Sequence, residues 1–251
     1  MIAYDLYIVY INFNTDMIKK WSDYKSINED KKTILDSTAM NKIDYYYLDY
    51  QVDLSIVREK YNLIEDNAYR AFATFADNIK HFLELPCEKI AIINYPPERH
   101  TKRNLVKKIN EVKNLDIDEI EFPWSYKYAQ WSKEDWREIV LECSNNGIKL
   151  RAMLEIGIQS EEDVKSDIDF LREIGIYSIM TSTGLIPEIT TMEKWNSIKN
   201  HIPRLFESKV VGILTISDIN DFIKSGADLS ATTIDLKVNY KQSDNEDYSS
   251  L

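Results

Sequence analysis

The chain has 251 residues and a formal net charge of −11, and it contains only six glycines and two cysteines. All six glycines follow position 146. The first half of the chain therefore lacks the glycines that a phosphate loop or a dinucleotide fingerprint needs for close backbone approach. This excludes an N-terminal Rossmann domain and a P-loop NTPase. The length fits one large domain or two small ones, and 44% apolar residues can supply a full core.

Charge and cysteine content predict the setting of the protein. Cys87 and Cys143 are too few for a disulfide framework and predict free thiols in a cytoplasmic protein. A basic leader is missing and the apolar runs are too short for a bilayer, so neither secretion nor a membrane partner is expected. An acidic chain repels nucleic acid unless its cations are concentrated. The densest basic run, 100–113, is interpreted as the solvated face of one helix, so no nucleic-acid partner is expected.

Residues 1–42 are predicted to form an N-terminal extension, with a strand-like run at 4–13 and then a polar segment rich in Lys and Asp. The extension could lengthen a sheet, cap one end of a barrel or make a homodimer contact. Its aromatic residues fit an interface, and they fit a packed edge strand as well. At the other end, residues 237–251 are polar enough to form a disordered tail.

Between these ends, residues 43–236 alternate short apolar runs with amphipathic stretches. The runs are four to nine residues long, as expected for parallel strands covered on both faces. They lie at 43–48, 70–75, 89–94, 117–123, 148–156, 176–182, 209–214 and 228–234.

Helix signals separate these runs. Ser132, Ser160, Thr190 and Thr215 each precede an acid by three residues, a pattern typical of helix starts. Gly147, Gly175 and Gly226 are placed where helices end in a left-handed residue. Eight strand–helix units predict a (β/α)8 barrel, with an open doubly wound sheet as the alternative.

Charged residues within the apolar runs mark the candidate site, because buried charges are costly unless they are paired. Glu119 and Glu121 share one strand face by period two, as do Arg151 and Glu155. Asp44 lies in the first run. If these faces point inward, Arg151 can neutralise one or two of the carboxylates. A structural ion-pair network and a catalytic group of acids both fit this pattern.

A metal site is not expected, because the three histidines are scattered and none has a His or Cys partner at ligand spacing. Cys143 is placed on a helix beside apolar residues and is predicted to lie in the core. The sequence gives no sign of a nucleophile elbow or a catalytic triad.

The sixth run resembles a known family. Residues 175–184 read Gly-Ile-Tyr-Ser-Ile-Met-Thr-Ser-Thr-Gly and are similar to the sixth strand of the deoxyribose-phosphate aldolase family, which ends in Lys-Thr-Ser-Thr-Gly. Further resemblances follow in chain order over residues 43–236. They are Ile-Asp at 43–44, Asn-Tyr-Pro at 94–96, residues 116–123 and 148–155, Gly-Ala-Asp at 226–228 and Thr-Thr at 232–233.

This resemblance implies aldol cleavage or condensation through a Schiff base, on a small carbonyl or sugar-phosphate partner and without a cofactor. It places Glu119 at the family's catalytic aspartate, Arg151 where a lysine is usual and Glu155 at a glutamate. With Asp44 and Lys209, these are the candidate catalytic residues. The candidate ligand contacts are Glu121, Met180, Thr181, Ser182, Thr183, Gly184, Gly212, Thr232 and Thr233.

The Schiff-base position itself holds Met180, and a thioether cannot form an imine. Lys209 lies within one residue of the family's second lysine, although an ungapped alignment puts Ser208 there. The family's phosphate grip has adjacent glycines, whereas only Gly212 is present here. The standard retro-aldol reaction is therefore expected to be lost or relocated.

Three functional hypotheses remain open. Lys209, or another inward lysine, could form the imine of a relocated aldolase. Glu119, Glu121 and Glu155 could instead serve as acid and base of a different reaction. Lastly, the barrel could be catalytically silent and bind a metabolite or a partner protein.

Overall fold

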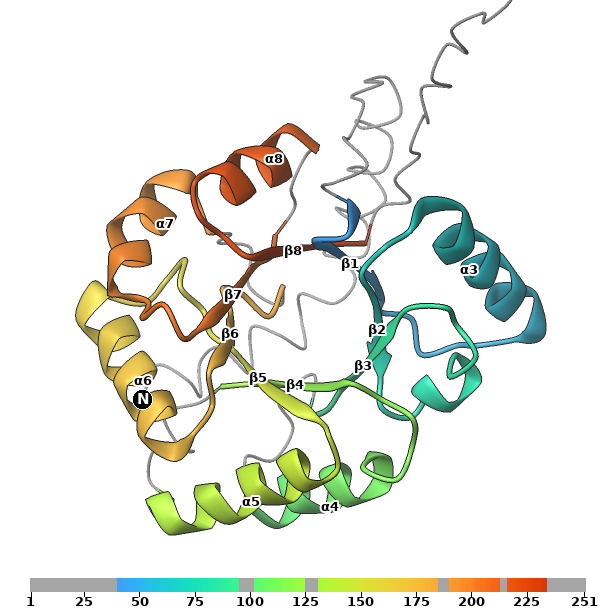
Figure 1. Ribbon diagram of the computed structural model, residues 1–251, viewed down its shortest axis with the longest axis horizontal. Coiled ribbons are helices and arrows are strands. Elements are labelled where there is room, and N and C mark those ends of the chain that lie inside the picture. The colour runs from blue at the N-terminus through green and yellow to red at the C-terminus, as the bar shows by residue number, and fades with distance from the viewer. Residues whose placement is uncertain (1–39, 95–101, 125–130, 185–189, 213–215, 234–251) are drawn as a thin grey trace, which may run out of the picture. The chain divides into compact units, whose positions relative to one another are not determined.

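The computed structural model describes residues 40–94, 102–124, 131–184, 190–212 and 216–233. Their eight strands are all parallel and follow one another around a closed barrel, with the helices on the outside (Figure 1). Closure comes from β1 and β8, where Asp44 is the register partner of Ala231. The predicted (β/α)8 barrel is confirmed, and the open doubly wound sheet is wrong.

The elements follow a regular order along the chain. The strands are β1 (Ile43–Tyr47), β2 (Ala71–Phe75), β3 (Glu88–Ile92), β4 (Glu119–Pro123), β5 (Lys149–Met153), β6 (Ser178–Met180), β7 (Glu207–Val210) and β8 (Leu229–Thr232). The α-helices are α3 (Leu54–Asn67), α4 (Lys102–Val112), α5 (Lys133–Asn145), α6 (Glu161–Ile174), α7 (Met192–Ile198) and α8 (Ile216–Lys224). The described residues also contain the short 3₁₀ helices η1 (Ile79–His81) and η3 (Lys199–His201).

Each predicted run contains part of a strand, but some boundaries differ. The fifth run was expected to continue to residue 156, whereas β5 ends at Met153. Leu154 N still donates to the carbonyl of Met180 at the end of β6, and Ile156 N donates to the carbonyl of Thr181 just after it, so the pairing continues beyond the regular strand. The β2–β3 connection, residues 76–87, holds only η1 within the described residues, and it contains Pro86, which lacks the backbone N–H that a helix interior needs.

The helix ends agree with the predicted signals except in one place. Ser132 and Ser160 are the N-caps of α5 and α6. The N-cap of α7 is Thr191 and not the predicted Thr190. The hydroxyl of Thr190 donates to the Thr181 carbonyl at 3.4 Å. The predicted cap at residue 215 lies outside the described residues. Gly147, Gly175 and Gly226 have φ values of 73°, 92° and 106°, as helix C-termini require.

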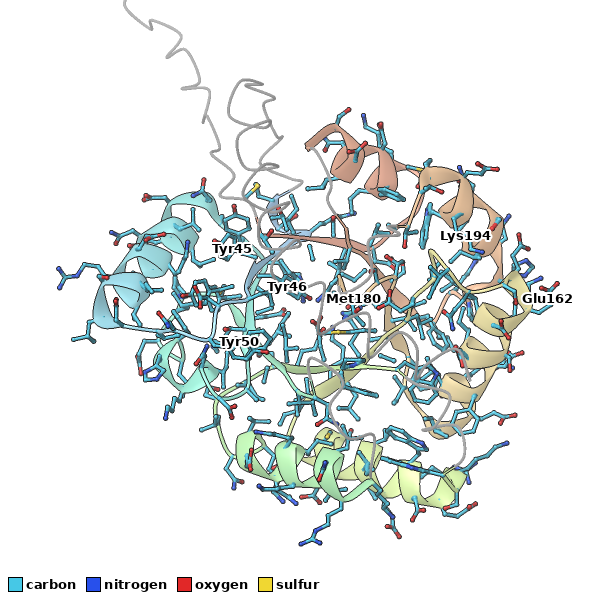
Figure 2. All side chains as sticks on the ribbon, turned by 180° about the vertical axis from the view of Figure 1, so that it is seen from behind. Tyr45, Tyr46, Tyr50, Glu162, Met180 and Lys194 are labelled. Atoms are coloured by element: carbon cyan, nitrogen blue, oxygen red, sulfur yellow. The ribbon has the colours of Figure 1, made fainter. Side chains whose placement is uncertain are left out.

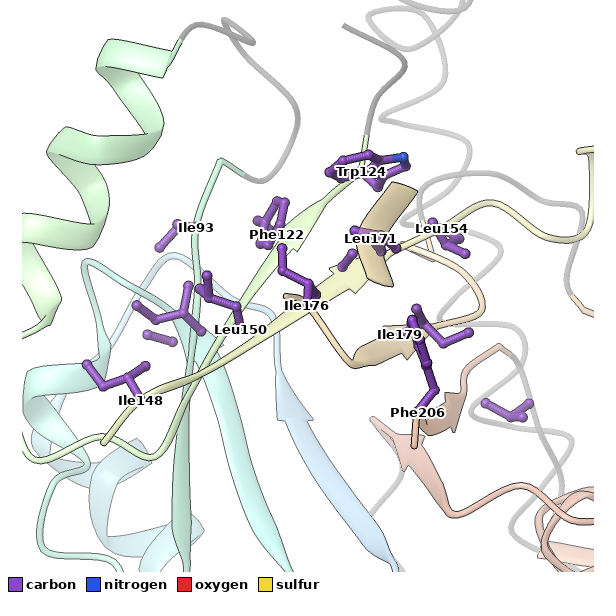
Figure 3. Packing of buried hydrophobic residues seen from close by; sticks show 14 of the residues in the cluster. Ile93, Phe122, Trp124, Ile148, Leu150, Leu154, Leu171, Ile176, Ile179 and Phe206 are labelled. Atoms are coloured by element: carbon purple, nitrogen blue, oxygen red, sulfur yellow. The ribbon is translucent and has the colours of Figure 1, made fainter. Parts of the chain in front are cut away.

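Apolar side chains form two separate layers. The larger layer lies between strands and helices, where Phe122, Leu150 and Ile179 from the strands pack with Leu171 from α6 (Figure 3). Cys143 is buried there, as predicted. A smaller layer faces the barrel interior, and its members are Tyr46, Ala71, Ala73, Phe75, Ile90, Ile92, Met153, Met180 and Ala231. The predicted extension at 1–42 and the tail at 237–251 fall almost entirely outside the described residues and stay predictions.

Candidate functional site

The barrel interior holds five charged side chains with no exposed surface. Asp44, Glu119, Glu121, Arg151 and Lys209 are each 0% exposed. They lie on β1, β4, β5 and β7, on the strand faces opposite the helices. The period-two pattern therefore brings these five predicted residues together in the barrel interior.

Lys209 is the centre of this group. Its Nζ atom forms ion pairs with Asp44, with Glu121 Oε1 at 2.5 Å and with Glu119 Oε1 at 3.4 Å. The same amine donates to the Tyr46 hydroxyl at 3.1 Å. Three carboxylates from two strands thus surround one ammonium group.

Arg151 neutralises Glu119, the carboxylate at the start of β4. Its Nε and Nη2 atoms donate to the two oxygens of Glu119 at 2.5 and 3.1 Å, which is a bidentate pair. Nη1 donates to the carbonyls of Ile179 and Glu207, both at 3.2 Å. Arg151 therefore ties β4, β5, β6 and β7 together from inside the barrel.

Four further charged residues extend the network toward the amino-terminal ends of the strands. Lys149 Nζ lies 3.0 Å from Glu119 and 2.8 Å from Glu207, and Arg151 also pairs with Glu207. Arg70 binds both oxygens of Asp44 at 2.6 Å and Glu88 at 2.5 Å. The sequence analysis missed these four residues, although Lys149, Glu207 and Glu88 each lie two positions before an inward-facing residue.

Electrostatic surroundings separate the two glutamates of β4. Burial raises the pKa of Glu119, but Arg151 and Lys209 outweigh burial and hold that pKa well below its ordinary value of 4.5. Burial raises the pKa of Glu121 as well. The charge of Lys209 lowers that pKa and the charge of Glu119 raises it, and the pKa stays above its ordinary value. Burial lowers the pKa of Lys209, but the charges of Asp44, Glu119 and Glu121 outweigh it, so the pKa is raised and the amine is an ammonium ion.

We expect Glu119→Gln to destabilise the protein far more than Glu121→Gln. Removing the charge of Glu119 leaves the buried guanidinium of Arg151 without its bidentate partner, a loss of about 3–5 kcal/mol. The pKa of Glu121 is raised rather than lowered, so the fold stabilises its charged form less than that of Glu119, and we expect its replacement to cost less than about 2 kcal/mol. Urea unfolding at pH 7 measures both changes, and equal losses would contradict the assignment.

The pH dependence of unfolding supplies an independent readout. Because the folded pKa of Glu119 is lowered, its stabilisation is complete above pH 4.5 and is lost as pH falls through the folded pKa. The sign is opposite for Glu121, whose contribution is present below pH 4.5 and is lost as pH rises through its raised folded pKa. Glu119→Gln should therefore reduce the loss of unfolding free energy at acid pH. Glu121→Gln should reduce the loss of unfolding free energy above pH 4.5.

Met180 completes the interior next to these charges. It is 2% exposed, belongs to the inner apolar layer and is the register partner of Lys209 on β7. Its Sδ atom lies 3.7 Å from the Tyr46 hydroxyl, which donates to Glu121 Oε2 at 2.6 Å. Figure 2 shows Tyr46 and Met180 near each other at the middle of the barrel. Tyr46 is thus a central residue that was not among the candidates.

Glu155 lies apart from the buried charges. It follows β5 and accepts hydrogen bonds from the turn after β6, namely from Thr183 N at 3.2 Å, from the Thr183 hydroxyl and from Ser182 Oγ at 3.2 Å. Gly184 has φ 74° and donates to Ser182 Oγ at 3.0 Å. The sequence predicted that Glu155 shares a strand face with Arg151. The regular strand β5 ends at Met153, so this face stops before Glu155.

The remaining candidates lie at the carboxyl ends of β6, β7 and β8. Thr181 is buried, and its hydroxyl accepts from Val211 N at 3.1 Å. Thr232 ends β8 and is buried, while Thr233 and Gly212 are half-buried. We call the ends of β5 to β8, comprising residues 154–159, 181–184, 211–212 and 232–233, the barrel mouth.

Other kinds of site find little support in the described part of the chain. It contains no cluster of three or more His, Cys, Asp or Glu arranged to hold a metal ion. Burial raises the pKa of both Cys87 and Cys143 to about 12, which makes poor nucleophiles. Among the helices of these residues, none is long and apolar enough to cross a membrane.

The fold and site define a closed (β/α)8 barrel whose interior is filled by an ion-pair network. Neither a protein-family model nor a curated protein matches the sequence. Solved structures do match the fold. An aldolase called QR15 is 21% identical with a TM-score of 0.72, over 80% of this chain and 93% of that one.

The tetrameric deoxyribose phosphate aldolase of Aeropyrum pernix is 17% identical with a TM-score of 0.71, over 80% of this chain and 89% of that one. The chain therefore has the fold of the deoxyribose-phosphate aldolases, as the motifs predicted. A 2,3-dimethylmalate lyase also matches, at 8% identity and a TM-score of 0.55, over 78% of this chain and 77% of that one. Proteins with different names share this fold, so the function has to be argued from the residues of the site.

Proposed function

We propose that the barrel mouth binds a small carbonyl or sugar-phosphate-type metabolite and that the Schiff-base reaction expected of this fold is lost. The observation that carries the proposal is the pair Met180 and Lys209. The thioether occupies the position where the aldolase motif has its lysine, and the neighbouring amine is enclosed by Asp44, Glu119 and Glu121.

Relocation of the imine to Lys209 is disfavoured by the same contacts. An amine attacks a carbonyl through its lone pair, which an ammonium ion lacks. Deprotonating Lys209 would remove the cation that compensates three buried carboxylates. The network therefore opposes the chemical step that a Schiff base requires.

A second candidate is acid–base chemistry, supported by Glu121 and Tyr46. Glu121 has a raised pKa, faces the barrel interior and accepts a hydrogen bond from the Tyr46 hydroxyl at 2.6 Å. A carboxyl group whose pKa is raised above its ordinary value can exchange a proton with a bound carbonyl compound. This candidate requires turnover of a ligand, whereas simple binding does not.

Two measurements test the proposal. Treatment with glyceraldehyde and borohydride should leave Lys209 unmodified by mass spectrometry, and a reduced adduct there would overturn the loss of imine chemistry. Thermal-shift titration with pentoses and pentose phosphates should raise the melting temperature, since a ligand at a hundredfold excess over its Kd stabilises by about 2.7 kcal/mol. If none of them raises it, the catalytically silent protein-binding barrel is favoured.

A further inference from the structure

An exposed tyrosine lies at the carboxyl ends of the first two strands. Tyr50 follows β1 by three residues, and 64% of its surface is exposed. Its ring stacks on the ring of Phe75, the last residue of β2, with the ring centroids 4.4 Å apart and an interplanar angle of 11°. Phe75 is buried and belongs to the inner apolar layer. These two rings, which we call the aromatic pair, therefore extend the apolar interior to solvent at this end of the barrel.

Hydrogen bonds fix the segment that carries Tyr50. The Tyr47 hydroxyl donates to the Gln51 carbonyl at 2.7 Å, and Gln51 N donates to Asp49 Oδ1 at 3.0 Å. From the β2–β3 connection, the buried side chain of Asn78 donates to the Asp49 carbonyl at 2.8 Å. A surface that is ordered before binding does not lose this conformational entropy when a ligand arrives. The aromatic pair is therefore preformed.

Polar groups lie across the barrel from the aromatic pair. Glu155 follows β5, and the Ser182 and Thr183 hydroxyls that donate to it follow β6. In the closed barrel, β3 and β4 separate the aromatic pair from these groups on one side, and β7 and β8 separate it on the other. Figure 2 shows Tyr50 within the outer ring of helices, on the same side of the barrel as Tyr46. The carboxyl end of the barrel thus has an aromatic side and a polar side.

This division favours a ligand that is divided in the same way. A sugar in its ring form has a face of C–H groups and a rim of hydroxyl groups. The C–H face can pack on an aromatic ring through dispersion and burial of apolar surface. The hydroxyl rim can exchange hydrogen bonds with hydroxyl and carboxylate groups of the protein. An open-chain polyol has the same hydroxyl groups but no rigid C–H face.

From this arrangement we infer that the aromatic pair is a binding platform for the ligand of the barrel mouth, and that Tyr50 selects sugars in their ring form over open-chain compounds. This inference rests on the proposed function and narrows its ligand class. Tyr50 is thereby a specificity-determining residue, and Phe75 supports its ring from below.

Calorimetric titration of the full chain with three compounds tests this selection. They are 2-deoxyribose, its methyl glycoside, whose ring cannot open, and 2-deoxyribitol, whose chain cannot close. We expect the glycoside to bind at least about threefold more tightly than 2-deoxyribitol, which is the range that one aromatic contact supplies. Equal binding of these two, or binding of 2-deoxyribose without the glycoside, would overturn the inference and leave the proposed function standing. If none of the three binds, the proposed function fails for sugars and the inference falls with it.

Variants of Tyr50 test whether the ring itself makes the contact. Tyr50→Ala should weaken binding of the glycoside about threefold to tenfold and leave that of 2-deoxyribitol nearly unchanged. Tyr50→Phe keeps the ring and should bind like the natural protein. Tyr177→Ala is the matched control and should also bind like it, because Tyr177 is 44% exposed and its ring contacts the buried ring of Phe206, but it precedes β6 at the amino-terminal end of the barrel.

Three results with these variants would contradict the inference. They are an unchanged Kd of the glycoside in folded Tyr50→Ala, an equal loss in Tyr177→Ala, and a loss in Tyr50→Phe as large as in Tyr50→Ala. The last result would assign the contact to the hydroxyl group and not to the ring face. If Tyr50→Ala does not fold, the comparison of the glycoside with 2-deoxyribitol on the natural protein still decides the question.

Discussion

Lys209→Met should reduce the free energy of unfolding by about 3–5 kcal/mol, because it leaves buried carboxylates without their shared cation. Asp44 keeps Arg70, and Glu119 keeps Arg151, but Glu121 loses its shortest ion pair. The methionine itself fits an interior that already contains other thioethers. Guanidinium unfolding at pH 7 measures the change.

Two further variants separate the ionic effect from the change in shape. Lys107→Met removes an exposed lysine on α4 and should leave stability unchanged within error. Adding Glu121→Gln to Lys209→Met should recover part of the loss, since it removes the uncompensated charge. A loss below about 1 kcal/mol, or no recovery in the double variant, would show that the network contributes little to stability.

Met180→Lys should restore an imine-forming side chain but only a weakly reactive one. The new amine would lie beside the Tyr46–Glu121 pair, and the carboxylate would hold it as an ammonium ion. Borohydride trapping with glyceraldehyde should therefore yield little adduct at position 180 at pH 7. We expect at least about a tenfold increase on combining Met180→Lys with Glu121→Gln, because Lys209 then opposes a second positive charge.

The trapping result discriminates between two causes of lost chemistry. Equal adduct in the single and double variants would mean that Glu121 does not control the amine. Adduct in neither variant would mean that aldehydes cannot reach position 180, which would remove this part of the interior from the ligand site. Adding Lys209→Met to the double variant should lower the yield again and serves as the control for the neighbouring ammonium.

The fold could be predicted because its determinants are local. Short apolar runs, hydroxyl caps such as Ser132 and Ser160, and glycines after helices each specify one element. Closure could not be predicted from these signals, since it depends on the register of β1 with β8 across most of the chain. The cap of α7 was misplaced by one residue because Thr190 and Thr191 carry the same hydroxyl signal.

The site was predictable only in part. Charged residues inside apolar runs identified four of the buried charges, Asp44, Glu119, Glu121 and Arg151, because such a charge is costly and must have partners. Lys209 was a candidate only through the resemblance to the aldolase family. Neither signal showed which partner each charge takes. That Glu155 binds the β6 turn rather than Arg151 follows from where β5 stops, which spacing along one strand does not specify. The central role of Tyr46 is likewise a tertiary contact.

The ion pair between Asp44 and Lys209 has a consequence for how the chain folds. It joins the first and seventh strands, and the Tyr46–Lys209 contact beside it spans 163 positions. Contacts so distant along the chain form only after a large loss of loop entropy. A partial barrel that stops before β7 would keep Arg70 beside Asp44 and Arg151 beside Glu119, but it would lack the cation that both share with Glu121. The interior charges therefore favour the closed barrel over a partial one. Lys209 on β7 supplies the cation that Asp44, Glu119 and Glu121 share in the closed barrel.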